Sequence, residues 1–112
     1  MITIILENEE NQIIEKVGAL GNRDYFLKPL DSKMYPVLSE LSDSDNEIVT
    51  SGEMPQLIKE LQTLKLTVDR EQAKEIDEVI KLAKISETDG KCFLVFTPFG
   101  SFWKIKSRQI FR

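Results

Sequence analysis

Two stretches in the middle of the chain have apolar residues every three or four positions, while both ends are rich in β-branched and aromatic residues. A spacing of three and four places side chains on one face of a helix. The patterns predict helices near residues 53–65 and 69–85. Strand-like ends separated by helices favour an α+β fold, with about three helices on one face of a mostly antiparallel sheet. A length of 112 residues predicts a single domain over residues 1–112.

The two helices have recognisable starts. Pro55 falls in the first turn of the helix near 53–65, where its missing N–H costs little. Asp69, followed three positions later by Gln72, has the pattern of a capping box at the start of the second helix. The polar stretch SETDG, residues 86–90, is predicted to end that helix and turn the chain.

A further helix is predicted over Ser32–Leu41. Asp31 or Ser32 is suited to cap it, and Pro36 lies in its first turn. Apolar residues follow at positions 0, 3, 4 and 7, which places them on one helical face. These residues are Met34, Val37, Leu38 and Leu41.

Strands are predicted at both ends of the chain. The run Ile2–Glu7 is short, β-branched and mostly apolar, which is typical of a strand buried on both faces. Residues 12–20 fit either the return strand of a hairpin or a short helix, and residues 48–50 fit a short strand. After Lys91, the segments KCFLVFTPF and FWKIKSRQIF flank the turn-like PFGS and predict a C-terminal hairpin.

Charge is distributed unevenly along the sequence. Residues 1–90 hold 19 acidic and 10 basic side chains, whereas residues 91–112 hold five basic side chains and no acidic one. An acidic body repels nucleic acid and attracts basic partners through its long-range field. The basic residues Lys104, Lys106 and Arg108 alternate with other side chains, which is typical of the solvated face of a strand. We therefore expect no nucleic-acid partner.

The composition narrows the possible chemistry. With no histidine and one cysteine, the sequence excludes Cys/His zinc sites and histidine-activated nucleophiles. Asp43 and Asp45 match the start of a calcium-binding loop, but Ile48 and Met54 stand where that loop needs glycine and glutamate. Paired carboxylates need a cleft that separates their pKa values, and the sequence around Asp43 supplies none. We expect no enzymatic activity, no catalytic residue, no metal and no cofactor.

The sequence also bears on location. No apolar run approaches the length of a membrane span, and the opening MITIILENEE lacks the basic start and long apolar stretch of a signal peptide. The single cysteine, Cys92, cannot form an internal disulfide and is expected to be a buried apolar residue. These features predict a cytoplasmic protein with no membrane partner.

Two groups of carboxylates are candidates for binding a basic protein. The first surrounds the segment DSDNE and consists of Asp43, Asp45, Glu47 and Glu53. The second lies at the start of the helix near 69–85, where Glu71, Glu75 and Glu78 form one stripe beside Asp69. Clustered carboxylates accept hydrogen bonds from Arg and Lys of a partner. The helical stripe equally fits a solvated face.

A short acidic α/β chain with the segments DSDNE and DREQAKEIDE resembles the immunity proteins of bacterial contact-dependent growth inhibition and related polymorphic toxin systems. The resemblance implies that the chain neutralises a cognate toxin domain, often a basic nuclease, by covering its active site. We expect an acidic partner-binding surface on a monomer or weak homo-oligomer. The alternative is a small non-catalytic scaffold or regulatory module that binds another protein or itself.

Overall fold

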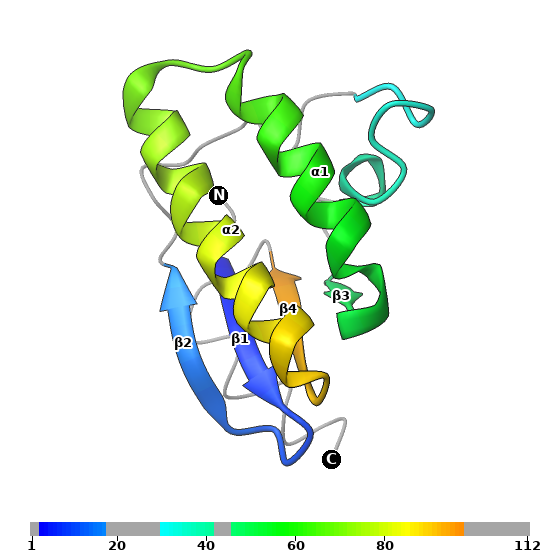
Figure 1. The fold of residues 1–112 in the computed structure, drawn as a ribbon, viewed down its shortest axis with the longest axis vertical. Coiled ribbons are helices and arrows are strands. Elements are labelled where there is room, and N and C mark those ends of the chain that lie inside the picture. The colour runs from blue at the N-terminus through cyan, green and yellow to red at the C-terminus, as the bar shows by residue number, and fades with distance from the viewer. Residues whose placement is uncertain (1–2, 18–29, 42–45, 98–112) are drawn as a thin grey trace.

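A computed structural model describes residues 3–17, 30–41 and 46–97 of the chain. Four strands form one antiparallel sheet in the order β2-β1-β4-β3. The strands are β1 (Thr3–Asn8), β2 (Ile13–Val17), β3 (Glu47–Val49) and β4 (Cys92–Thr97). Helices α1 (Met54–Lys65) and α2 (Arg70–Asp89) lie side by side over one face of this sheet (Figure 1). The predicted α+β class and the antiparallel sheet are confirmed.

The sheet begins with a hairpin. β1 and β2 are joined by a tight loop in which the Asn8 side chain accepts the backbone N–H groups of Glu10 and Gln12, each at 3.0 Å. Asn11 adopts φ 64° there, a left-handed conformation that asparagine tolerates better than most residues. Of the two possibilities for residues 12–20, the strand is confirmed over Ile13–Val17.

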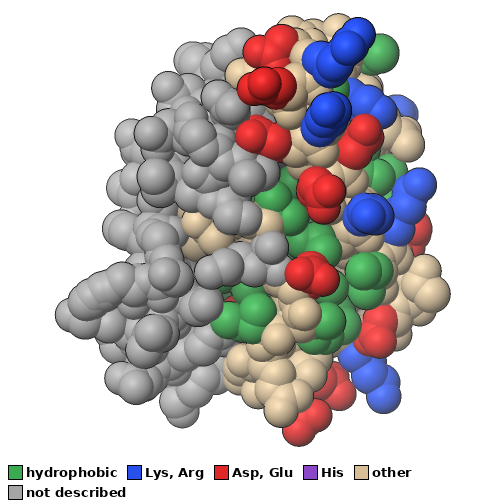
Figure 2. Space-filling view, turned by 90° about the vertical axis from the view of Figure 1, so that its left-hand side faces the viewer, with side chains coloured by type: hydrophobic (Ala, Val, Ile, Leu, Met, Phe, Trp, Pro, Cys, Tyr) green, Lys and Arg blue, Asp and Glu red, His purple; other side chains and the backbone are tan. Residues whose placement is uncertain are grey.

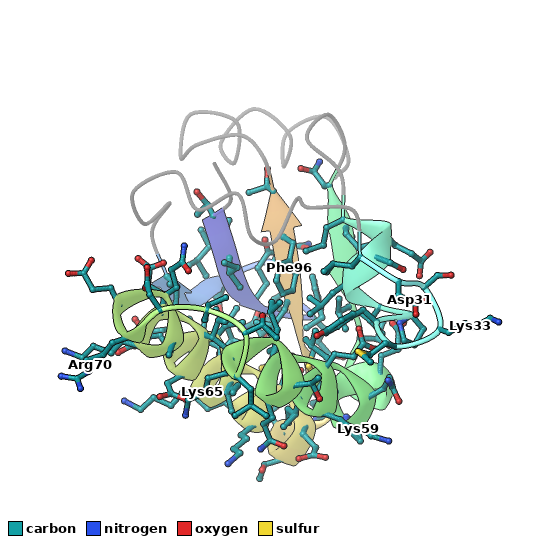
Figure 3. The ribbon with its side chains drawn as sticks, turned by 90° about the horizontal axis from the view of Figure 1, so that it is seen from above. Asp31, Lys33, Lys59, Lys65, Arg70 and Phe96 are labelled. Carbon is teal, nitrogen blue, oxygen red and sulfur yellow. The ribbon has the colours of Figure 1, made fainter. Side chains whose placement is uncertain are left out.

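The main core lies between the sheet and the two helices. β1 and β4 contribute Ile4, Leu6, Leu94 and Phe96, all at most 2% exposed, and Phe96 points from β4 toward the helices (Figure 3). The helices contribute the apolar stripes that the sequence predicts. These are Met54, Leu57, Leu61 and Leu64 on α1, and Ile76, Val79, Ile80 and Ala83 on α2. Each large buried side chain contributes roughly 1.5–3 kcal/mol of transfer free energy, so these stripes hold the helices against the sheet.

The opposite face of the two central strands is also shielded from solvent. Ile5 and Val95 are paired across β1 and β4 and alternate with the core residues along each strand. Both are buried, at 1% and 4% exposure. Burial on both faces was predicted for this first strand, and it is confirmed.

The helix predicted over Ser32–Leu41 is wrong. The structure has turns from Asp31 and only a short 3-10 helix, η2 (Leu38–Glu40). Of the predicted apolar residues, Leu38 is buried and Val37 and Leu41 pack against the core, whereas Met34 is 57% exposed. A segment this short forms little helix by itself, and its backbone is fixed by contacts with α1. Two α-helices, rather than about three, cover the sheet in the described part of the chain.

The boundaries of the two α-helices refine the predictions. α1 follows a turn of 3-10 helix, η3 (Ser51–Glu53), and has Pro55 in its first turn as predicted. The capping box of Asp69 and Gln72 at the start of α2 is confirmed. α2 continues through SETD to Asp89 and ends at Gly90, which adopts φ 77°. The prediction that SETDG ends the helix is therefore correct only for its last residue.

Only the first strand of the predicted C-terminal hairpin, β4, lies among the described residues. β4 lies between β1 and β3, which pair with it on opposite sides, so residues Leu94–Phe96 have no free edge for a return strand. The predicted return strand, with its Lys104, Lys106 and Arg108, lies outside the described residues. Among the described residues, no helix is long and apolar enough to cross a membrane.

Candidate functional site

The first predicted carboxylate group lies beside β3, at one edge of the sheet. β3 is held there by its pairing with β4, in which Glu47 lies opposite Phe96 and Val49 opposite Leu94. The next turn is fixed by a hydrogen bond of 3.2 Å from the Ser51 hydroxyl to the carbonyl of Gly90. The edge strand and the end of α2 are thus joined, which gives Glu47 a defined position.

Glu47 is the centre of a cluster of three carboxylates. Its pKa is raised, first by partial burial and then by the negative charges of Glu40 and Glu53. Because like charges disfavour ionisation of a nearby carboxyl, this shift indicates that Glu40 and Glu53 lie within electrostatic range of Glu47. They come from three different elements: η2, β3 and η3. We call Glu40, Glu47 and Glu53 the edge cluster.

Glu53 also has a local structural role. One carboxylate oxygen accepts both the backbone N–H and the hydroxyl of Thr50, each at 3.1 Å, in a capping box at the start of η3. The side chain is exposed. Glu53 therefore contributes to the field of the edge cluster while its orientation is fixed by Thr50.

Asn46 adds a polar atom directly before β3. Its side-chain oxygen is buried and has no hydrogen-bond partner within the described part of the chain. A buried acceptor without a donor is costly, at about 1–3 kcal/mol.

The edge cluster agrees only in part with the prediction. Glu47 and Glu53 were predicted partner-binding residues, and the structure brings them together. Asp43 and Asp45 lie outside the described residues. Glu40 was missed, although it lies only three positions before Asp43 in the printed sequence, and a wider search of that acidic run would have included it.

The second predicted group, on α2, is less open than its sequence suggests. Asp69 is occupied as the N-cap, accepting the N–H of Gln72 at 2.8 Å. Glu71 and Glu75 both have interaction partners, and Glu78 is exposed. These residues remain predicted partner contacts, but a partner would have to compete with the interactions that Asp69, Glu71 and Glu75 already make.

Basic side chains are interspersed with the acidic residues of α2. The ammonium group of Lys65 lies 2.8 Å from the carboxylate of Asp77, an exposed pair of small stabilising effect. Figure 2 shows acidic and basic side chains mixed over this side of the molecule. Lys65 and Arg70 extend from the helical layer into solvent (Figure 3). A uniform acidic field therefore does not cover α2.

A buried carboxylate that the sequence analysis missed lies on α1. Glu60 is 1% exposed and accepts the backbone N–H groups of Val37 and Leu38, with its shortest contact at 2.8 Å. The amide of Gln56 donates to its other oxygen at 2.8 Å. No sequence signal distinguishes Glu60 from the solvated glutamates of a helix. Its partners make it a structural residue that positions η2, and with it Glu40.

In the described part of the chain, few side chains are suited to metal binding or to nucleophilic chemistry. No group of three or more His, Cys, Asp or Glu side chains among the described residues is arranged to hold a metal ion, and this includes the edge cluster. Cys92 is buried as predicted, and its thiol pKa is raised by burial, by a hydrogen bond with Asp89 and by nearby negative charge. A raised pKa leaves the thiol protonated and weakly nucleophilic.

Comparison with known proteins gives no further assignment. No family model matches the chain, and neither the curated proteins nor the solved structures include a significant match.

Proposed function

We propose that this protein is an immunity protein that binds and neutralises a cationic, nuclease-type toxin domain. The observation that supports the proposal is the position of Glu47 on β3, within electrostatic range of Glu40 and Glu53. The negative charges of Glu40 and Glu53 oppose ionisation of Glu47 in the free protein. A cation placed among them would relieve that repulsion, so part of the binding free energy comes from the unbound state.

The chemistry of a nuclease suits such a surface. A nuclease groove carries Arg and Lys because it holds phosphates. Carboxylates of the edge cluster compete for the same side chains and accept charge-assisted hydrogen bonds from them. The net acidic charge of residues 1–90 would speed encounter, since steered association reaches roughly 10⁸–10⁹ M⁻¹s⁻¹ at low salt. Binding over the groove would exclude substrate.

The remaining predicted residues take secondary places in this proposal. Asp43 and Asp45 lie in the chain between Glu40 and Glu47 and stay candidates on the sequence alone. Glu71 and Glu78 are the exposed members of the α2 stripe, but Glu71, like Asp69 and Glu75, already has interactions. We therefore expect the edge cluster to contribute more than the stripe.

The proposal predicts that a neighbouring gene encodes a basic toxin-like domain, and it is tested with that domain. The two proteins are co-expressed, growth is measured, and the association rate is followed at low and high salt. Glu47→Lys is compared with Glu10→Lys, which makes the same charge change at an exposed position in the β1–β2 loop. We expect Glu47→Lys to slow association about tenfold more than Glu10→Lys at low salt. Equal rates for both variants, or no protection by the parent protein, would contradict the proposal.

A self-associating scaffold is the second candidate. The observation that favours it is the exposed apolar surface on β2, where Ile13 and Ile14 are 37% and 50% exposed. Exposed apolar residues on an edge strand favour pairing with another chain. Molar mass by light scattering separates the two candidates, since a stable homodimer without a cationic partner would favour the scaffold.

A further inference from the structure

Among the described residues, β3 is the last strand of the sheet on this side. β4 pairs with one side of β3, and no strand within residues 3–17, 30–41 and 46–97 pairs with the other. An edge strand presents N–H and C=O groups that another extended chain can bind. This way of binding, in which a partner adds a strand to a sheet, is common in peptide recognition.

The side chains of β3 alternate between two kinds of surface. Glu47 and Val49 share one face of the strand, and Ile48 lies on the other face opposite Val95. Ile48 is 50% exposed, whereas Val95 is 4% exposed. An added strand would therefore meet a carboxylate on one face and an uncovered isoleucine on the other.

The negative charge around β3 determines which kind of segment would bind there. Glu40 and Glu53 reinforce the negative charge of Glu47, so a residue placed opposite Glu47 is stabilised if it is basic. A residue placed next to Ile48 is stabilised if it is apolar and β-branched, because such pairs pack well across strands. The complementary segment alternates basic and β-branched residues.

The other edge of the sheet suits this occupant less well. Strand β2 also exposes isoleucines, but its pairing with β1 contains an irregularity between Leu6 and Glu7. Bulges of this kind bend an edge and hinder addition of a further strand. β2 also lacks a cluster of carboxylates like the one at β3 among the described residues, since only Glu15 lies on it.

We propose that the β3 edge binds an extended segment of alternating Lys or Arg and β-branched residues as a fifth strand of the sheet. This inference rests on the proposed function, because the segment would belong to the cationic toxin domain. β3 has only three residues and offers few main-chain hydrogen bonds. Binding therefore depends on the edge cluster and on Ile48 together, which gives selectivity for sequence pattern as well as charge.

The direct test uses two blocked synthetic peptides of equal composition. One alternates, as Lys-Val-Lys-Val-Lys, and the other is the permuted Val-Val-Lys-Lys-Lys. Binding is followed by amide chemical shifts and hydrogen exchange of the full chain at low salt. We expect the alternating peptide to bind about tenfold more tightly. We also expect it to shift the amides of residues 47–49 and slow exchange of those that point outward.

Two matched variants locate the site. Ile48→Lys places a cation on the β3 edge, and Ile14→Lys does the same on β2, where the parent isoleucine is also 50% exposed. We expect Ile48→Lys to remove the preference for the alternating peptide and Ile14→Lys to keep it. Thermal unfolding of both variants establishes that they are folded, and Ile48→Val provides a conservative variant that retains binding.

Four results would overturn the inference. Equal binding of the two peptides would indicate charge attraction without strand pairing. An equal loss in both lysine variants would place the contact elsewhere. Slow exchange of all β3 amides in the free protein would mean that the edge is already occupied. If the Ile48→Lys variant still neutralises the toxin, strand addition is wrong but the immunity function stands. If the alternating peptide binds but the protein does not neutralise the toxin, the immunity function is wrong but strand addition stands.

Discussion

The carboxylate of Glu60 accepts the backbone N–H of Leu38 at 2.8 Å, and this contact joins the 3-10 helix η2 to α1. A second N–H, that of Val37, reaches the same carboxylate at 3.0 and 3.1 Å. The N–H donors that bind this buried carboxylate replace the hydrogen bonds that water would otherwise donate to it. Because η2 carries Glu40, this buried residue also sets the geometry of the edge cluster.

Removing the Glu60 carboxylate should destabilise the fold. Glu60→Ala leaves two backbone N–H groups without their acceptor, and we expect a loss of about 2–3 kcal/mol in the free energy of unfolding, measured with urea. Glu60→Gln keeps one acceptor oxygen and should lose less. Gln56→Ala is the control, since it removes one donor at the partly buried end of the network. A Glu60→Ala protein as stable as Gln56→Ala would contradict the structural role.

Glu47 should make stability depend on pH. Its folded-state pKa is raised above the ordinary 4.5, so folding favours the protonated form. The resulting stabilisation is complete below pH 4.5 and is lost as pH rises through the folded-state value. We therefore expect Glu47→Gln to be more stable than the parent at pH 7, with the difference vanishing in acid. Salt should narrow that difference by screening Glu40 and Glu53, and a difference independent of pH would count against the edge cluster.

Gly90 should resist substitution for conformational reasons alone. Its φ of 77° is unfavourable for residues with a side chain, although an added Cβ would contact nothing within 4 Å. We expect Gly90→Ala to cost about 1–2 kcal/mol in urea unfolding. Gly52→Ala is the matched control, because that position is also open and lacks a positive φ. Equal stability of the two variants would show that backbone conformation does not limit this helix end.

Substitutions of Asp69 can separate its capping role from a role in binding. Its side chain accepts the N–H of Gln72 at 2.8 Å, so Asp69→Ala should lower stability by about 1 kcal/mol. Asp69→Asn retains an acceptor and should lose much less, while removing the charge. Thermal unfolding measures both effects. If Asp69→Asn is stable yet binds the toxin domain more weakly, the carboxylate has a separate role in binding.

Cys92 should react slowly with thiol reagents. Burial and the neighbouring Asp89 raise its pKa, which keeps the sulfur protonated, and the side chain is 4% exposed. At pH 8 we expect the folded protein to react far more slowly with a disulfide reagent than the protein unfolded in guanidinium. Equal rates in the two states would mean that β4 opens readily.

Sequence patterns predicted the elements whose stability is local. The apolar stripes of α1 and α2 and the capping box at Asp69 follow from spacing alone, and the structure contains them. The end of α2 was predicted too early because SETDG is polar. Ser86 there is fully buried and donates its hydroxyl to the Cys92 carbonyl at 2.6 Å, a contact that no local pattern contains.

Long-range contacts account for what the sequence did not predict. The segment 32–41 has a helical pattern, but its backbone N–H groups bind Glu60, more than 20 positions away. The edge cluster likewise depends on η2, β3 and η3 meeting in space. Its acidic residues were visible in the sequence, whereas the position of β3 beside β4 was not.

The order of strands also bears on how the protein is made. β1 takes its main partner from near the other end of the described chain, with Thr3 opposite Thr97. During translation the N-terminal hairpin and both helices leave the ribosome before β4 is available. A transcript that stops ahead of Cys92 would yield a chain with apolar β1 exposed, a substrate for chaperones and proteases. Because β4 is synthesised after the other strands of the described sheet, that sheet can be completed only once synthesis has passed residue 97.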